Sequence, residues 1–75
     1  MRYRILATSL EDRRCLLTLA DDGDYYLLVF SGGDSRQVKV EGRQAEKLQY
    51  SRGWVPAKDH RPRTIYDLRR QISFV

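Results

Sequence analysis

The chain has 75 residues, a formal net charge of +4 and one cysteine. Its length predicts one small domain, residues 1–75, which would bury only about 60% of its unfolded surface, so we expect another protein or a second copy of the chain to add stability. The composition excludes an internal disulfide and a cysteine-based zinc site. Since neither a membrane-spanning run nor a signal-peptide pattern is present, we expect a cytoplasmic protein without membrane contact.

Basic residues gather in the second half of the chain. Residues 1–35 carry four arginines against six acidic residues, whereas residues 36–75 carry ten basic residues against four acidic ones. Eleven of the fourteen basic residues are arginine, which favours bidentate contacts to phosphate or carboxylate. A genome rich in G and C would produce the same arginine bias, so charge alone leaves the class of partner open.

Four strands are expected, at residues 2–8, 14–20, 25–30 and 36–40. They are separated by turn signals at Glu11-Asp12, Asp22-Gly23 and Gly32-Gly33. The third segment runs from Tyr25 to Phe30 without a polar residue, which is typical of a strand buried on both faces. We therefore place it at the centre of an antiparallel meander.

Two-residue turns in all three hairpins predict which side chains share a face. One face is almost wholly apolar and forms the expected main core: Tyr3, Ile5, Ala7, Leu16, Thr18, Ala20, Tyr25, Leu27, Val29, Val38 and Val40. The other face is apolar at its centre, with Leu6, Cys15, Leu17, Leu19, Tyr26, Leu28 and Phe30, and polar toward its edges, with Arg4, Thr8, Gln37 and Lys39. We expect only its centre to be covered, either by a helix of the chain or by another molecule. This register sets Asp21 opposite Asp24, and such facing like charges leave a longer second turn open.

Two short helices follow the strands. Residues 42–50 have helical spacing, with Ala45 and Leu48 on the buried side, and residues 54–63 have the prolines of a connecting loop. Thr64 and Asp67 resemble a capping box at the start of a second helix, and residues 73–75 either dock on the sheet or fray. The predicted fold class is α+β: a four-stranded antiparallel meander, able to curl into an SH3- or Tudor-like partial barrel, followed by two short helices.

Residues 3–50 carry a resemblance to a known family. The order of strands and turns, the apolar run from Tyr25 to Phe30 and the segment 42–48 after the fourth strand resemble the N-terminal Tudor-like domain of PipX. PipX proteins are cyanobacterial transcriptional co-activators that also bind the signalling protein PII. The resemblance implies a non-enzymatic regulatory adaptor, although PipX continues with longer helices where this chain has a Trp-Pro loop and one short helix.

The leading functional hypothesis is an adaptor that binds another protein, or a second copy of itself, through sheet edges and a partly covered face. Its predicted contact residues are Tyr26, Leu28, Phe30 and Lys39. The competing hypothesis is a nucleic-acid-binding module, with cations on phosphates and an aromatic ring on a base. Its candidate residues are Arg52, Trp54, Lys58, His60, Arg61, Arg63, Arg69 and Arg70, against the reading that Trp54 is a core residue beneath a solvated loop.

Signals for catalysis, metals and cofactors are weak. His60 has no interpretable orienting partner, and Cys15 lies in an apolar strand, where a thiol is unreactive. The segment 21–24 has the composition of a calcium loop but not its spacing, and residues 31–33 lack the lysine of a phosphate-binding loop. We therefore expect no enzyme activity, no metal and no cofactor.

Overall fold

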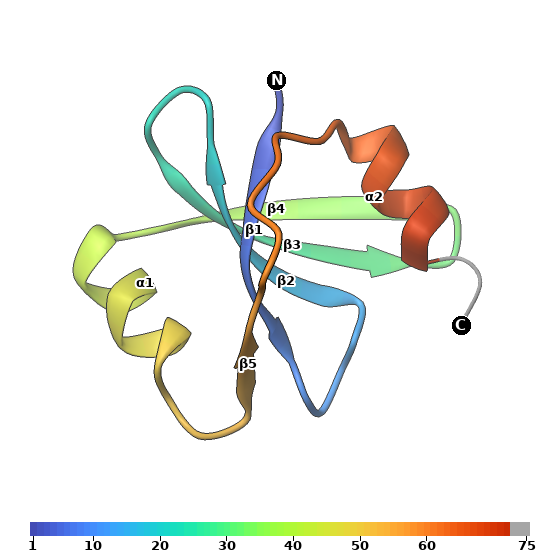
Figure 1. Ribbon diagram of the computed structural model, residues 1–75. Coiled ribbons are helices and arrows are strands. Elements are labelled where there is room, and N and C mark those ends of the chain that lie inside the picture. Colours follow the sequence, from blue (N-terminus) through green and yellow to red (C-terminus); the bar gives the residue numbers. More distant parts are fainter. Residues whose placement is uncertain (73–75) are drawn as a thin grey trace.

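The computed structural model describes residues 1–72, so the expectation for residues 73–75 lies outside the described residues. Its elements are β1 (Tyr3–Ser9), β2 (Cys15–Ala20), β3 (Tyr25–Ser31), β4 (Asp34–Val40), α1 (Gly42–Gln49), β5 (Trp54–Pro56) and α2 (Ile65–Ile72). The strands form one antiparallel sheet in the order β4-β3-β2-β1-β5 (Figure 1). The α+β class and the four-stranded meander are confirmed. Within the described part, no helix is long and apolar enough to cross a membrane.

The fifth strand is a correction to the expected loop. Residues Trp54 to Pro56 pair antiparallel with the second half of β1, from Ser9 to Ala7. Three residues that include a proline carry little strand signal of their own. The pairing arises because β1 would otherwise leave its outer edge unpaired beside the returning chain.

The hairpin between β2 and β3 differs by one residue from the predicted register. Leu16 pairs with Leu28 and Leu19 with Tyr25, because three residues separate Ala20 from Asp24 where we expected two. Gly23 has a φ of +88°, the left-handed conformation that closes a three-residue hairpin loop. The longer turn also removes the predicted pairing of Asp21 with Asp24. The two-residue turn at Gly32-Gly33 is confirmed, since Ser31 pairs with Asp34.

This change of register reverses the predicted faces of β3, because neighbouring residues of a strand point to opposite sides. Leu28 and Phe30, expected on the partly covered face, lie in the core cluster with Tyr3, Leu16 and Ala20. Tyr25 and Leu27, expected in the main core, belong instead to the second cluster with Ala7, Leu17 and Val40.

A bulge in β1 adds a second departure from simple alternation. Ile5 pairs with Thr18 but Ala7 pairs with Leu17, so Leu6 is an extra residue on β1. As a result Ile5 packs against the first cluster and Ala7 belongs to the second, although we predicted both on one face.

Each face of the sheet has its own helix (Figure 1). Leu68 of α2, with no exposed surface, completes the cluster around Phe30, and Ile65 and Ile72 pack beside it. Ala45 of α1 completes the cluster around Leu17, which Leu48 and Trp54 border. We call these sides the α2 face and the α1 face. Two small cores, each closed by a helix of eight residues, replace the expected single main core.

The predicted capping box begins α2. The Asp67 N–H donates to Thr64 Oγ1 at 3.2 Å, and the Thr64 N–H donates to Asp67 Oδ2 at 3.3 Å. The Thr64 hydroxyl also donates to Asp67 Oδ2 at 3.0 Å, and this bond, followed by the one from the Thr64 N–H, holds the pKa of the Asp67 carboxyl below its usual value. The helix therefore begins where the spacing predicted.

Residues 57–64, which we call the strap, run along the outer edge of β1 from β5 to α2 (Figure 1). Backbone hydrogen bonds attach both of its ends: the Ala57 N–H donates to the Leu6 carbonyl at 2.9 Å, and the Arg63 N–H donates to the Tyr3 carbonyl at 2.8 Å. Between these points, Arg4 Nη1 donates to the carbonyl of His60 at 3.2 Å. The strap thereby carries the basic segment of the sequence across the sheet edge.

Candidate nucleic-acid interface

The four predicted protein-contact residues fall into two groups. Leu28 and Phe30 are 0% and 4% exposed, because α2 covers them. Tyr26 is half-buried and Lys39 is exposed, and the Lys39 ammonium lies 3.3 Å from the Asp24 carboxylate. Of the two possible covers, a helix of the chain or another molecule, it is the chain's own α2 that covers Leu28 and Phe30, and Tyr26 and Lys39 stay at least partly accessible.

Tyr26 is held by the turn that precedes its strand. Its hydroxyl donates to Asp22 Oδ2 at 2.8 Å, and its ring meets that of Tyr3 edge to face, with centroids 6.2 Å apart. The hydrogen bond to Asp22, assisted by desolvation, raises the pKa of Tyr26 to about 12. The pKa of Asp22 is lowered in turn, first by the Asp24 N–H and then by the Tyr26 hydroxyl.

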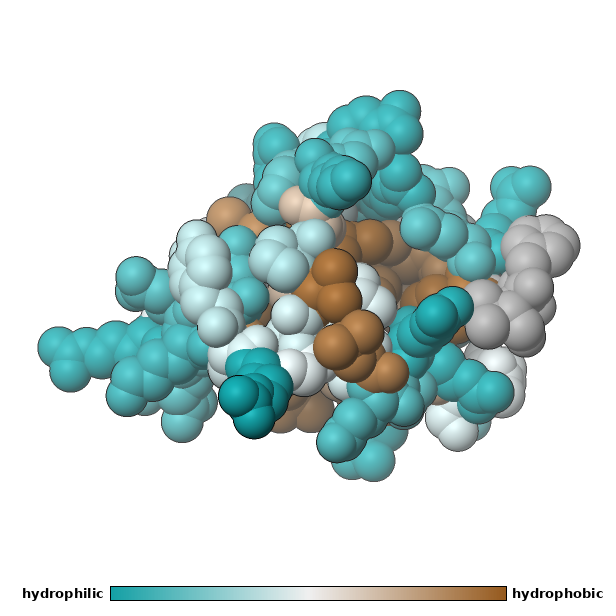
Figure 2. Space-filling model, turned by 60° about the horizontal axis from the view of Figure 1, so that its bottom comes forward, coloured by the Kyte–Doolittle hydropathy of each residue, from teal (hydrophilic) through white to brown (hydrophobic). Residues whose placement is uncertain are grey.

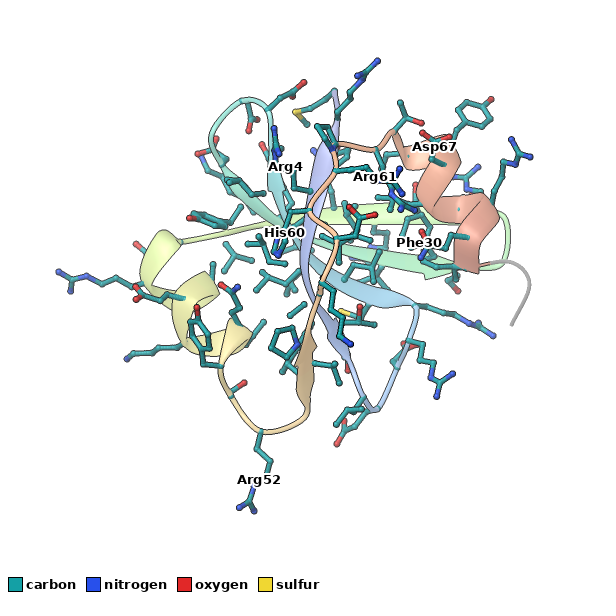
Figure 3. The ribbon with its side chains drawn as sticks, viewed as in Figure 1. Arg4, Phe30, Arg52, His60, Arg61 and Asp67 are labelled. Carbon is teal, nitrogen blue, oxygen red and sulfur yellow. The ribbon has the colours of Figure 1, made fainter. Side chains whose placement is uncertain are left out.

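The candidate nucleic-acid residues do not all lie together. Arg52, in the loop between α1 and β5, projects from the end of the molecule away from Arg61 and His60 (Figure 3). Trp54 is half-buried and packs in the α1 core, so it is not available as an exposed stacking platform. Its role as a core residue, the competing reading of the sequence, is the one that the structure supports.

Asp59 organises the arginines of the strap. Its carboxylate accepts the Arg61 N–H at 3.0 Å, Arg61 Nε at 2.8 Å and Arg63 Nη2 at 3.2 Å. These bonds hold the pKa of Asp59 below its usual value, the backbone N–H of Arg61 being the largest cause. Arg63 also donates from Nη1 to Gln71 Oε1 on α2, and only 26% of its side chain is exposed. One acidic residue thus places two guanidinium groups side by side.

An open depression of about 490 Å³ lies where the strap meets α2. We call it the arginine depression; it is lined by Arg61, Pro62, Arg63, Asp67, Arg70 and Gln71. Three cations and one carboxylate therefore face the same space, and the carboxylate of Asp67 is already engaged by the helix cap. Arg61, Arg63 and Arg70 are the members of the predicted set that the fold brings together.

The remaining candidates are peripheral to this depression. Lys58 and His60 are exposed on the strap, and His60 contributes its carbonyl to the bond from Arg4. Arg69 donates from Nη2 to Ser35 Oγ at 3.2 Å, at the start of β4, while its Nε is buried with no hydrogen-bond partner among the described residues. Arg69 therefore serves the contact between α2 and the sheet.

A second depression, of about 190 Å³, lies on the other side of the strap. Its lining residues are Arg2, Arg4, Leu19, Asp21 and Pro62. Pro62 lines both depressions, so the two are neighbours across the strap. We call this second one the Pro62 depression. The sequence did not identify Arg2, Arg4 and Asp21 as site residues, since they lie about forty or more positions from the basic segment. Only the pairing of the strap with β1 brings the basic segment beside them.

Apolar side chains gather at the end of the molecule that carries β5 and the loop between β1 and β2 (Figure 2). Leu10 and Val55 are 62% and 47% exposed there. A further depression of about 150 Å³ lies between α2 and the sheet, with Ile5, Leu16 and Ile72 among its lining residues.

Within the described residues no group of three or more His, Cys, Asp or Glu side chains could hold a metal ion. The Cys15 thiol has a raised pKa, mainly through burial and then through the Asp12 carboxylate, so it remains protonated near neutral pH. The arginine depression and the Pro62 depression each combine arginines with an aspartate in their lining. Comparisons of the chain with protein-family models, with curated proteins and with solved structures find no match.

Proposed function

We propose that this chain is a non-enzymatic module that binds the phosphate backbone of nucleic acid through the arginine depression. The observation that carries the proposal is the convergence of Arg61, Arg63 and Arg70 on one open space, with Asp59 positioning two of them. Guanidinium groups match phosphate oxygens in planar, bidentate pairs. Their grouping favours this function over the protein contact that the sequence favoured.

The ion pairs within the strap leave these arginines able to bind. The Arg61 and Asp59 side chains are 75% and 45% exposed, and an ion pair in contact with solvent contributes only about 0–1 kcal/mol, so a phosphate can share Arg61 with the carboxylate or replace it. Asp59 therefore acts as an orienting group whose loss would free the Arg61 side chain to move, while Gln71 would still hold Arg63. Lys58, next to Asp59 on the strap, is an exposed cation on the same segment.

Fluorescence anisotropy with an end-labelled oligonucleotide of about twelve nucleotides tests the proposal, at about 50 and 200 mM salt. The wild type should bind more weakly at the higher salt. Single-stranded ligand should give a slope of log affinity against log salt near −2, about 0.7 for each of three phosphate contacts. Arg61→Ala and Arg70→Ala should each weaken binding and reduce the slope by about 0.7.

Arg52→Ala is the matched control, because it removes the same charge from the distant end of the molecule (Figure 3). It should change neither the affinity nor the slope beyond the small effect of net charge. Absence of binding at the lower salt, or an equal loss in Arg52→Ala and Arg61→Ala, would contradict the proposal.

A second candidate function, the protein-binding adaptor implied by the resemblance to PipX, is favoured by β4. This strand of seven residues lies at the edge of the sheet, and most of its side chains are exposed. Its outer backbone groups could pair with an extended segment of a partner, beside Lys39 and half-exposed Tyr26. Amide exchange measured with and without a captured partner should then show new protection in β4, whereas unchanged exchange there would remove this candidate.

A further inference from the structure

The Pro62 depression differs in character from the arginine depression. Leu19 and Pro62 contribute apolar residues to its lining, and Arg2 and Arg4 line the same space. Arg4 and Leu19 are cross-strand partners on β1 and β2, and the hydrogen bond from Arg4 to the His60 carbonyl fixes the strap beside them. Arginine planes and apolar surface together suit a flat aromatic ring.

The volume of this depression, about 190 Å³, is smaller than the roughly 300–1,000 Å³ of pockets that hold drug-sized ligands. It therefore accommodates one ring system and not a whole nucleotide. The phosphates of such a ligand would lie outside it, and the arginine depression is next to it across Pro62.

Asp21 gives the depression a directional polar group. Asp21 is one of the lining residues, and its carboxylate accepts the backbone N–H of Arg2 through Oδ2 at 3.2 Å. An ionised carboxylate only accepts hydrogen bonds, so it favours a ring that presents an amino group over one that presents a carbonyl oxygen. Among nucleobases, the 4-amino group of cytosine is such a donor, and carboxylates are its usual protein partners.

We propose that the Pro62 depression binds one unstacked, amino-bearing base of a single strand, with its 4-amino or equivalent group on Asp21, while the neighbouring phosphates occupy the arginine depression. This inference rests on the proposed nucleic-acid function and adds the class of ligand, which is a single-stranded nucleic acid in which cytosine is preferred to uracil. A duplex is disfavoured because its bases are stacked and their pairing edges are occupied.

Homopolymers of deoxycytidine and deoxyuridine, matched in length and label, test the inference, because the two bases are nearly equal in size and differ where Asp21 would make contact. The wild type should bind the deoxycytidine strand about threefold to tenfold more tightly, the value of one net hydrogen bond. A duplex of equal length should bind more weakly than the deoxycytidine strand. Asp21→Asn keeps an acceptor for the Arg2 N–H but offers both a donor and an acceptor to the base, so it should remove the preference.

Asp34→Asn is the control, since it removes one negative charge from the start of β4, at the opposite end of β3 from Asp21. Both variants should strengthen binding of all strands slightly through net charge, but only Asp21→Asn should remove the preference for cytosine. The base site is overturned if the wild type binds the two homopolymers with equal affinity, or if both variants lose the preference equally. Salt-dependent binding in that case would still support the phosphate function. If no strand binds at low salt, both proposals fail.

Discussion

The backbones of Tyr3 and Arg63 are hydrogen-bonded in both directions, with N···O distances of 2.7 Å from Tyr3 N–H and 2.8 Å from Arg63 N–H. This pair closes the strap onto the start of β1 only two residues before α2 begins at Ile65. One short pairing therefore directs α2 onto the face that contains Phe30. It also places Arg63 between Asp59 and Gln71, so the core and the arginine depression depend on the same point of the chain.

Leu68→Ala should destabilise the protein by about 2–5 kcal/mol, because the Leu68 side chain has no exposed surface and its loss would leave a cavity between α2 and the sheet. Urea denaturation followed by circular dichroism measures the change. Tyr66→Ala is the control from the same helix, since Tyr66 is 77% exposed and should cost less than about 1 kcal/mol. Similar losses in the two variants would mean that α2 does not pack as described.

Gly23→Ala should cost about 1–2 kcal/mol through backbone strain alone, because Gly23 has a φ of +88° and an added Cβ meets nothing within 4 Å. Gly33→Ala is the matched control: its Cβ also meets nothing, and Gly33 does not have a left-handed φ, so that strain is absent. Denaturant midpoints of the two variants make the comparison. An unchanged midpoint in Gly23→Ala would contradict the three-residue turn.

The sequence predicts most elements of this fold but not which side of the sheet each side chain of β3 occupies. Asp22-Gly23 fits a two-residue turn and the second half of a three-residue turn equally well, because both use a left-handed glycine. The facing charges of Asp21 and Asp24 were the one local sign of the longer turn. The bulge at Leu6 has no comparable signal, since it results from fitting β1 to both of its neighbours.

Thr64→Ala should destabilise the protein by about 1 kcal/mol at neutral pH, the usual cost of losing an N-cap side chain. The pKa of Asp67, now held low mainly by Thr64, should rise toward its ordinary value. NMR titration of the Asp67 carboxyl and denaturation as a function of pH provide the measurements. Thr64→Ser keeps the hydroxyl and should leave both properties close to those of the wild type.

The sign of this pH effect follows from the lowered pKa of Asp67 in the folded protein. The contribution of the carboxylate is present above the unfolded value and is lost as the pH falls through the folded value, that is, below about pH 4. The difference between wild type and Thr64→Ala should therefore shrink as the solution is acidified. A difference that grew on acidification would show that the capping bonds favour the protonated form.

Tyr26→Phe should remove the tyrosine that ionises at a pKa of about 12. Because this pKa is raised above the ordinary value near 10, the hydrogen bond to Asp22 stabilises the fold below pH 10, and its contribution is lost as the pH rises toward 12. Tyrosinate absorbance during an alkaline titration detects the step. Asp22→Asn leaves an acceptor but removes the charge, so it should move the step to lower pH without abolishing it.

The sequence predicts only part of the candidate site, because some of its residues lie far apart along the chain and are brought together by the fold. Arg61, Arg63 and Arg70 stand out because basic residues cluster there, and the strap and α2 keep them together. The pairing of the strap with β1 places the basic segment beside Arg2, Arg4 and Asp21. Residues 57–64 have no strand pattern from which this pairing could be predicted. Arg52 and Trp54 were grouped with the cluster by closeness in sequence, although β5 and α1 direct them elsewhere.

The number of residues in the turn between Ala20 and Asp24 determines which face of the sheet each side chain of β3 occupies. A substitution at Asp21 changes one exposed side chain, whereas loss of one turn residue would exchange the two faces of β3 and place Tyr25 and Leu27 beneath α2. The same deletion would move Leu28 and Phe30 out of the core cluster that Leu68 of α2 completes. The length of this turn therefore sets which residues of β3 lie in each core, while the left-handed φ of Gly23 and the hydrogen bond from Tyr26 to Asp22 constrain its composition.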